Sequence, residues 1–131
     1  MQIIRTLIVD DDAGFRRRLS EFLASEPGIE IVGEAADGLE VIPKATELKP
    51  DLVLMDVRMP GMNGVNATRK LKEEMPEVKL IMLSVFDLPE YREAAMVSGA
   101  SDYVVKKSMI EELVPAIRRI CSIEGSVTSN A

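Results

Sequence analysis

The sequence contains no histidine and only one cysteine, which excludes several kinds of functional site. Without histidine the chain has no histidine-based catalytic triad, no histidine zinc site and no imidazole to carry a phosphoryl group. The single thiol, Cys121, permits no internal disulfide, and this agrees with a reducing compartment. Any metal-binding or group-transfer chemistry is therefore left to carboxylates.

Long apolar runs and an excess of basic charge are also missing. Runs such as LVLM and LIML are far shorter than the roughly 20 residues of a membrane span, and the opening MQIIRTL lacks the pattern of a signal peptide. We therefore expect a soluble, cytoplasmic protein with no membrane partner. The formal net charge of −6 argues against direct nucleic acid binding by this chain, because that binding depends mainly on neutralising phosphates.

The remaining composition fits one globular domain. With 131 residues, 47% of them hydrophobic and 29% charged, the chain is long enough for one core and too short for two ordinary domains. We expect the domain to cover residues 1–124. The last residues, 125–131 (GSVTSNA), have the composition of a C-terminal tail or the start of a linker.

Short strand-like runs alternate five times with segments of helical period. The predicted strands are residues 3–9, 29–34, 52–55, 79–84 and 103–105, and the predicted helices are 13–25, 37–48, 63–75, 89–98 and 109–123. Strands that are apolar along their whole length favour a parallel sheet covered by helices on both faces. Pro43 and Pro115 fall inside two of these helices, where we expect bends.

Capping signals mark the starts of four predicted helices. A short polar side chain at such a position accepts hydrogen bonds from backbone N–H groups that the helix leaves unpaired. The signals are Asp12 before the first helix, Asp37 with Glu40 at the second, Asn63-Gly64 at the third, and Ser108 with Glu111 at the last.

Polar side chains gather where the predicted strands end. In an open parallel sheet, ligands bind outside the carboxyl ends of the strands. The residues at these ends are Asp10, Asp11 and Asp12, then Asp56, Ser84 and Lys106. Carboxylates brought together repel one another, and Mg²⁺ suits such oxygen ligands. A phosphoryl group on Asp56 would add negative charge for Lys106 and the Ser84 hydroxyl to hold.

Four motifs at these strand ends carry a family resemblance. IVDDD, VLMDVRMPGMNG, IMLS and YVVK, in this order and spacing, resemble the receiver domain of two-component response regulators. The resemblance covers about residues 3–123. It implies a flavodoxin-like, CheY-like α/β fold, (βα)5, in which a doubly wound parallel sheet of five strands has the order 2-1-3-4-5.

The resemblance also implies a phospho-acceptor and a metal site. Asp56 would take a phosphoryl group from a sensor histidine kinase in a Mg²⁺-dependent reaction. Asp11 would bind Mg²⁺ directly and Asp10 largely through water. Asp56 itself and the backbone carbonyl of Arg58 would complete the protein's share of the ligands.

Further roles follow from the same resemblance. Ser84 and Lys106 would contact oxygens of the phosphoryl group, and Tyr103 would change its rotamer with the phosphorylation state. Arg58 and Phe86 stand two residues beyond the acceptor and the serine, at the positions that tune dephosphorylation. Because both side chains are bulky, we expect restricted access for water and slow loss of phosphate.

The segment after the last strand departs from the common family pattern. The family often has proline after the lysine, frequently through a cis bond, whereas Lys107 follows Lys106 here and leaves the geometry of that peptide open. The stretch GASDYVVKKS instead resembles the NarL group, in which a LuxR-type helix-turn-helix output domain regulates transcription. That output domain is absent from this chain, and the tail favours truncation over a stand-alone receiver.

Neighbouring residues allow two readings. The first group is basic and forms a solvated face or helps to dock an acidic kinase: Arg16, Arg17 and Arg18. The second group is apolar and covers the core or forms a surface for a partner: Phe86, Leu88 and Tyr91. A homodimer can form on phosphorylation. The sequence identifies neither the kinase and its signal nor the target genes.

Two other functions compete with a phosphorylation-controlled signalling domain. One is a Mg²⁺-dependent phosphatase or phosphotransferase that acts on outside substrates through Asp56, but such enzymes usually have an acid two residues later, where Arg58 stands. The other is a receiver that serves only as a constitutive scaffold, which the complete set of site residues disfavours. We therefore expect no enzyme beyond a domain that catalyses its own phosphotransfer and dephosphorylation.

Overall fold

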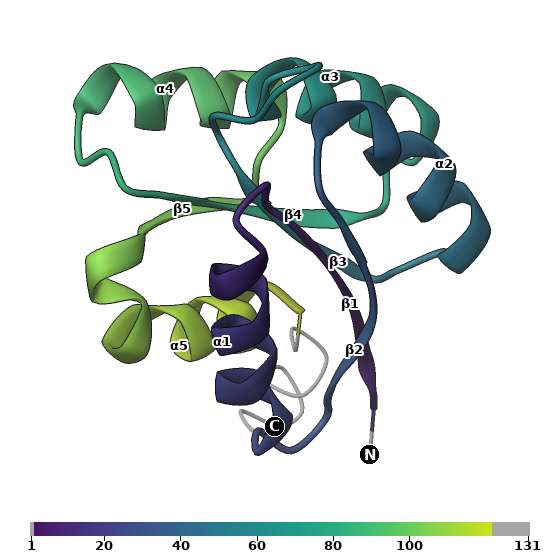
Figure 1. Cartoon of the computed structure of the whole chain (residues 1–131), viewed down its shortest axis with the longest axis vertical. Coiled ribbons are helices and arrows are strands. Elements are labelled where there is room, and N and C mark those ends of the chain that lie inside the picture. Colours follow the sequence, from purple (N-terminus) through teal and green to yellow (C-terminus); the bar gives the residue numbers. More distant parts are fainter. Residues whose placement is uncertain (1, 122–131) are drawn as a thin grey trace, which may run out of the picture.

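The computed structural model describes residues 2–121, and within them five strands alternate with five α-helices (Figure 1). The strands are β1 (Ile4–Val9), β2 (Ile29–Ala35), β3 (Leu52–Asp56), β4 (Lys79–Ser84) and β5 (Asp102–Val105). The helices are α1 (Ala13–Ala24), α2 (Gly38–Leu48), α3 (Gly64–Glu74), α4 (Pro89–Ser98) and α5 (Met109–Cys121), the last preceded by a 3₁₀ turn, η1 (Lys106–Ser108). The predicted tail and the predicted domain boundary at residue 124 lie outside the described residues.

All five strands run parallel in one sheet of order β2-β1-β3-β4-β5. This confirms the predicted flavodoxin-like fold. Within the described residues, each predicted boundary coincides with the observed one or differs from it by a single residue. The most useful of these differences is that β3 includes Asp56, so the carboxylate is held by the sheet itself.

Side chains of each strand alternate between two apolar layers. Leu7 and Val9 point into the layer covered by α2, α3 and α4, whereas Ile8 between them points into the layer covered by α1 and α5. Figure 1 shows these helix groups on opposite faces of the sheet. The core on both faces makes the sheet a rigid support for the loops at its carboxyl edge.

Three of the four predicted caps are confirmed. The Asp12 carboxylate accepts a hydrogen bond from the Phe15 backbone N–H at 3.1 Å, and Asn63 caps α3 in the same way. The Asp37 side chain accepts from two backbone N–H groups at the start of α2. Ser108 is different, because it is the last residue of η1 and the turn continues directly into α5.

Both prolines lie within continuous helices, Pro43 in α2 and Pro115 in α5, and the bends expected there stay predictions. The peptide between Lys106 and Lys107 is trans, since residues 2–121 contain no cis bond. Among these same residues, no helix has the length and apolar character required to cross a membrane.

Candidate functional site

The strand register brings the polar strand ends to one edge of the sheet. Paired residues in neighbouring strands are Val9 with Met55, Asp56 with Leu83, and Ser84 with Val105. Asp10 therefore leaves β1 beside Asp56, and Lys106 leaves β5 one residue beyond the partner of Ser84. The predicted site residues from four strands meet at this edge because parallel strands all end there.

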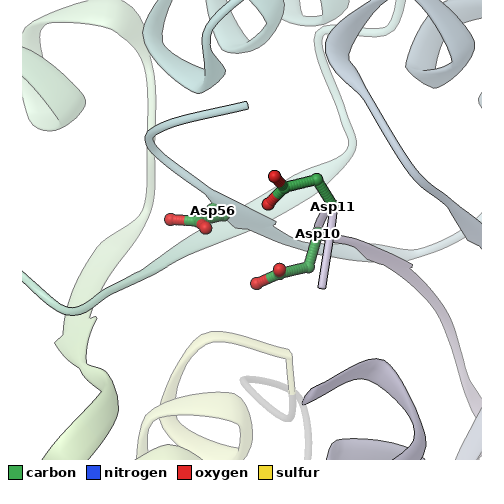
Figure 2. Close-up of side chains that lie close together, drawn as sticks. All are labelled: Asp10, Asp11 and Asp56. Carbon is green, nitrogen blue, oxygen red and sulfur yellow. The ribbon is translucent and has the colours of Figure 1, made fainter. Parts of the chain in front are cut away.

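Three carboxylates converge at the centre of this edge. Asp10, Asp11 and Asp56 each offer one oxygen, and these oxygens all lie within 4.8 Å of one another. Figure 2 shows the side chains of Asp10 and Asp11, from the end of β1, gathered beside that of Asp56 at the end of β3. Asp10 is buried, Asp56 is partly buried and Asp11 is exposed.

This donor set fits a hard divalent cation such as Mg²⁺. Carboxylate oxygens are its preferred protein ligands, and Mg²⁺ usually takes only one or two of them together with water and phosphate oxygens. The exposed Asp11 faces solvent, so a cation and its water ligands have a way in. Three carboxylates from two strand ends thus offer the kind of oxygen ligands that this ion prefers.

Lys106 supplies the positive charge of the cluster. Its Nζ lies 2.7 Å from Oδ2 of Asp10 and 3.4 Å from Oδ2 of Asp56. The same nitrogen lies 4.0 Å from the centroid of the Phe15 ring on α1. The lysine is thus held between two carboxylates and an aromatic face, and its shorter contact is to Asp10.

Asp10 is also fixed by residues at and just before the start of α1. Its Oδ1 accepts a hydrogen bond from the Asp12 backbone N–H at 2.9 Å, and its carbonyl oxygen accepts one from Arg16 Nη1 at 2.6 Å. Arg16 also forms an ion pair with Glu34. The Arg16 side chain is only 18% exposed, because its guanidinium ties α1 to the residue after β1 and to β2, so the predicted solvated face does not include it. The alternative role of these arginines in docking a kinase stays a prediction. Arg17 is exposed, as predicted.

The pKa of the Asp56 carboxyl is raised, and the main cause is burial. The charge of Asp10 raises this pKa further, whereas the charge of Lys106 lowers it. The sequence pattern indicated repulsion between carboxylates, but desolvation at the end of a buried strand contributes more. The backbone N–H of Arg58 approaches Asp56 Oδ1 at 3.4 Å.

Ser84 and Tyr103 are both connected to the backbone of Phe86. The Ser84 side chain is fully buried, and its Oγ accepts a hydrogen bond from the Phe86 N–H at 3.0 Å. The Tyr103 hydroxyl donates to the Phe86 carbonyl at 2.7 Å, and burial raises the pKa of this phenol. Tyr103 thus has its ring inside the protein, 2% exposed.

Three side chains stack beside the acceptor. The Arg58 guanidinium carbon lies 5.3 Å from the centroid of the Phe86 ring, and this ring lies 4.8 Å from that of Tyr91 at 17° between planes. Arg58 and Tyr91 also line an open groove of about 770 Å³ that includes Asp11. Tyr91 packs against the core, as one of the two predicted alternatives has it, whereas Leu88 is exposed and a partner surface there stays a prediction.

Gly64 is a positioning residue that the sequence pattern did not single out. Its N–H donates to the Val57 carbonyl at 2.7 Å, and a Cβ at this position would lie 2.1 Å from the Asp56 carbonyl oxygen. Such a contact is far inside van der Waals distance. The glycine in the pair Asn63-Gly64 was the sequence signal for this close approach, but helix capping and turn formation already accounted for the pair.

Comparisons with known proteins agree on one family. Residues 6–118 match the family described as the response regulator receiver domain. Response regulator GacA of Pseudomonas aeruginosa is 40% identical over 118 residues, which cover 90% of this chain and 55% of GacA. Response regulator protein VraR of Staphylococcus aureus is 42% identical over 118 residues, covering 88% of this chain and 56% of VraR. The chain thus spans about half the length of the curated relatives it matches.

Solved structures show the same fold. The receiver domain of the putative response regulator NarL from Mycobacterium tuberculosis has a TM-score of 0.85 at 28% identity, covering 91% of this chain and 96% of that one. A DNA-binding response regulator of the LuxR family from Staphylococcus aureus has a TM-score of 0.83 at 28% identity, covering 89% and 98%. Both belong to the NarL and LuxR groups that the sequence resembles.

Proposed function

This chain belongs to the response regulator receiver domain family, and from that premise we propose that Asp56 accepts a phosphoryl group from a sensor histidine kinase. The observation that carries the proposal is the meeting of Asp10, Asp11, Asp56 and Lys106 at one sheet edge. Of the three carboxylates, Asp56 is the one that ends a strand of the sheet and touches both a lysine and the loop after β3.

The transfer is a substitution at phosphorus. An oxygen of the Asp56 carboxylate forms a bond to phosphorus, the bond between phosphorus and the donor imidazole nitrogen breaks, and its electron pair stays with that nitrogen. A bound Mg²⁺ and Lys106 would both favour the ionised form of Asp56, which is the form that attacks phosphorus. The rigid end of β3 fixes the attacking oxygen, so positioning supplies much of the rate.

Asp10, Asp11, Asp56 and the backbone carbonyl of Arg58 would hold Mg²⁺. The bound cation would offset negative charge on the phosphoryl oxygens during transfer. Lys106 stands within 3.4 Å of Asp56 and needs only a small movement away from Asp10 to pair with an oxygen of the new phosphoryl group.

Ser84 and Tyr103 would convert phosphorylation into a change of shape. The Ser84 oxygen accepts from the Phe86 N–H, and its hydroxyl, which also interacts with the Tyr103 phenol, would turn to donate to a phosphoryl oxygen. Such a charge-assisted hydrogen bond contributes about 1.5–3 kcal/mol, which shifts a two-state equilibrium by roughly 10- to 150-fold. Tyr103, bonded to the Phe86 carbonyl, would follow any movement of that loop.

Arg58 and Phe86 would tune how long the phosphoryl group survives. Their stacked side chains stand next to the acceptor and leave less room for water. We expect slow hydrolysis of the acyl phosphate for this reason.

The proposed output domain of this protein is inferred from its relatives. GacA and VraR are response regulators about twice the length of the matched region, and the similar LuxR-family regulator is described as DNA-binding. We infer a receiver over residues 1–124, joined through a linker that starts near residue 125 to a LuxR-type DNA-binding output domain that regulates transcription. We also propose that the protein is cytoplasmic and that it forms a homodimer on phosphorylation. This domain itself would make no direct contact with DNA. The domain acts on its own phosphoryl group, not on outside substrates.

Intact mass spectrometry after incubation with acetyl phosphate tests this function. The wild-type protein should gain the mass of one phosphoryl group in Mg²⁺ and not in EDTA, whereas Asp56→Asn should gain none. Asp87→Asn, at an exposed carboxylate outside the cluster, is the matched control and should behave as wild type. Equal labelling of Asp56→Asn and wild type contradicts the assignment, and absence of any labelling favours a scaffold.

A further inference from the structure

We propose that Tyr91 is a positioning residue for the loss of the phosphoryl group, because its ring holds Phe86 against Arg58 and keeps this stack closed beside Asp56. The inference rests on the proposed function, since it concerns the lifetime of the phosphoryl group on Asp56. It assigns control of that lifetime to a residue of α4, on a helix that contributes nothing to the carboxylate cluster.

The stack joins three segments that are far apart in the sequence. Arg58 lies in the loop after β3, Phe86 in the loop after β4, and Tyr91 in the first turn of α4. The two rings are nearly parallel, at 17° and 4.8 Å, and the guanidinium lies 5.3 Å from the Phe86 centroid. Aromatic pairs and cation–π pairs at these separations are attractive beyond the area they bury.

Phe86 has a fixed backbone and a side chain whose orientation depends on the stack. Its N–H donates to Ser84 and its carbonyl accepts from Tyr103, so the main chain is held from both sides. The adjoining residues of the loop offer little support, because Val85 is 65% exposed and Asp87 is exposed as well. The ring is therefore oriented mainly by its two stacking partners.

Tyr91 is the anchored member of the stack. Its ring packs against the apolar core between the sheet and α2, α3 and α4, and its backbone N–H bonds to the Leu88 carbonyl at the start of the helix. Arg58, at the other end, is exposed. A flexible cation cannot hold the Phe86 ring by itself, so the stack depends on Tyr91.

Arg58 connects the stack to the acceptor. Its backbone N–H contacts Asp56 Oδ1, while its side chain extends to the Phe86 ring. Arg58 and Tyr91 both line the groove that includes Asp11, and this groove is an approach from solvent to the carboxylate cluster. The stack therefore holds Arg58 at the wall of this groove, and the position of that side chain would set how much room water has beside the acceptor.

Hydrolysis requires that water. The water oxygen forms a bond to phosphorus, the bond between phosphorus and the Asp56 oxygen breaks, and the electron pair returns to the carboxylate. The water proton leaves with inorganic phosphate or passes to solvent. Opening the stack admits water more often and raises the rate of this step without changing its chemistry.

The test measures how fast the phosphorylated 131-residue protein loses its phosphoryl group, in wild type and in substituted variants. Each variant is phosphorylated with acetyl phosphate in Mg²⁺, the donor is removed, and the phosphorylated fraction is followed by intact mass. Tyr91→Leu and Tyr91→Met both remove the ring but keep an apolar side chain against the core. We expect both to lose phosphate about two- to tenfold faster than wild type, the change that corresponds to losing one aromatic pair.

Three controls separate positioning from a general loss of structure. Tyr91→Phe keeps the ring and should decay like wild type. Val97→Ala, at a residue of α4 that is 82% exposed, should also decay like wild type. Phe86→Ala should decay faster than wild type, and the double variant Tyr91→Leu/Phe86→Ala should decay no faster than Phe86→Ala alone, because the residues act as one unit.

The outcomes of these experiments distinguish a failure of this inference from a failure of the proposed phosphorylation of Asp56. If the wild type gains no phosphoryl group, the proposed function fails and the inference fails with it. If the wild type is phosphorylated on Asp56 but Tyr91→Leu and Tyr91→Met decay at its rate, the inference alone is overturned. Multiplicative effects in the double variant also overturn it, since they would show that Tyr91 acts independently of Phe86.

Discussion

The ammonium nitrogen of Lys106 lies 4.0 Å from the centroid of the Phe15 ring while it pairs with Asp10 at 2.7 Å. The lysine comes from the end of β5 and the ring from the first turns of α1, so a helix on one face of the sheet helps to place a charge at its edge. The Lys106 side chain is only 14% exposed, and in that environment the ring contact is weakly screened.

Phe15→Leu should slow phosphorylation by acetyl phosphate. Leucine keeps an apolar side chain in the core but offers no aromatic face, so Lys106 is held less firmly for its contact with the phosphoryl group. A cation–π contact contributes roughly 0.5–2 kcal/mol, so we expect a rate about two- to thirtyfold lower. The measurement is the initial rate of phosphoryl gain by intact mass. Phe22→Leu, at a partly buried ring on the same helix, is the matched control, and an equal effect there would contradict a specific role for Phe15.

Lys106→Met should lower the free energy of unfolding in EDTA. The substitution leaves Asp10, which is 2% exposed, without its cationic partner, although the Asp12 N–H still bonds to it. We expect a loss of about 1–3 kcal/mol in urea denaturation, and partial recovery when Mg²⁺ is added. Lys107→Met, at the exposed neighbour, should change the stability little. A variant as stable as wild type in EDTA would show that the ion pair with Asp10 is not needed.

Asp56→Asn should raise the free energy of unfolding in EDTA at neutral pH. Burial raises the pKa of Asp56 in the folded protein, so the folded state binds more protons than the unfolded state between pH 3.8 and that raised pKa. In the wild type, the free energy of unfolding therefore falls as the pH rises through that window, because Asp56 must ionise while buried. The neutral amide that replaces this carboxyl cannot ionise, so the Asp56→Asn variant does not lose this free energy. The gain should be fully present above the window and disappear below it, as measured by urea denaturation at a series of pH values.

Asp12→Asn is the control of opposite sign. The backbone hydrogen bond from Phe15 is the main reason that the pKa of Asp12 is lowered, so its carboxylate stabilises the folded state above pH 3.8, and the benefit is lost as the pH falls through the lowered value. Neutralising Asp12 should not increase stability at neutral pH. If Asp12→Asn and Asp56→Asn both stabilise the protein equally, burial of Asp56 is not the cause.

Gly64→Ala should destabilise the loop that follows the acceptor. The added methyl would lie 2.1 Å from the Asp56 carbonyl oxygen and 2.9 Å from the Val57 Cα, and both are backbone atoms that cannot turn aside. Overpacking of this kind typically costs about 1–3 kcal/mol. Asn66→Ala, at an exposed position of the same helix, should cost far less. The midpoint temperature of thermal unfolding and the phosphorylation rate should both be lower in Gly64→Ala than in wild type. Wild-type values for both would contradict the close approach of Gly64 to the Asp56 backbone.

Much of the architecture followed from local chemistry. The alternation of apolar strands with amphipathic helices predicted the parallel sheet, and Asp12, Asp37 and Asn63 predicted helix starts that the structure confirms. These inferences succeed because capping and hydrophobic period act over a few residues of one segment. Ser108 failed as a cap because the preceding turn could continue into α5, which depends on how β5 meets that helix.

The sequence by itself also determined which polar residues meet. Asp10, Asp11, Asp56, Ser84 and Lys106 follow strands, and parallel strands in one sheet end at a common edge. Tertiary structure alone decided the contacts among them and their neighbours. Lys106 is closer to Asp10 than to Asp56, Phe15 lies under the lysine, Arg16 turns inward to Asp10, and Tyr91 supports Phe86. Spacing along the chain places a residue at an edge, but the direction of its side chain is set by the packing of helices from distant segments.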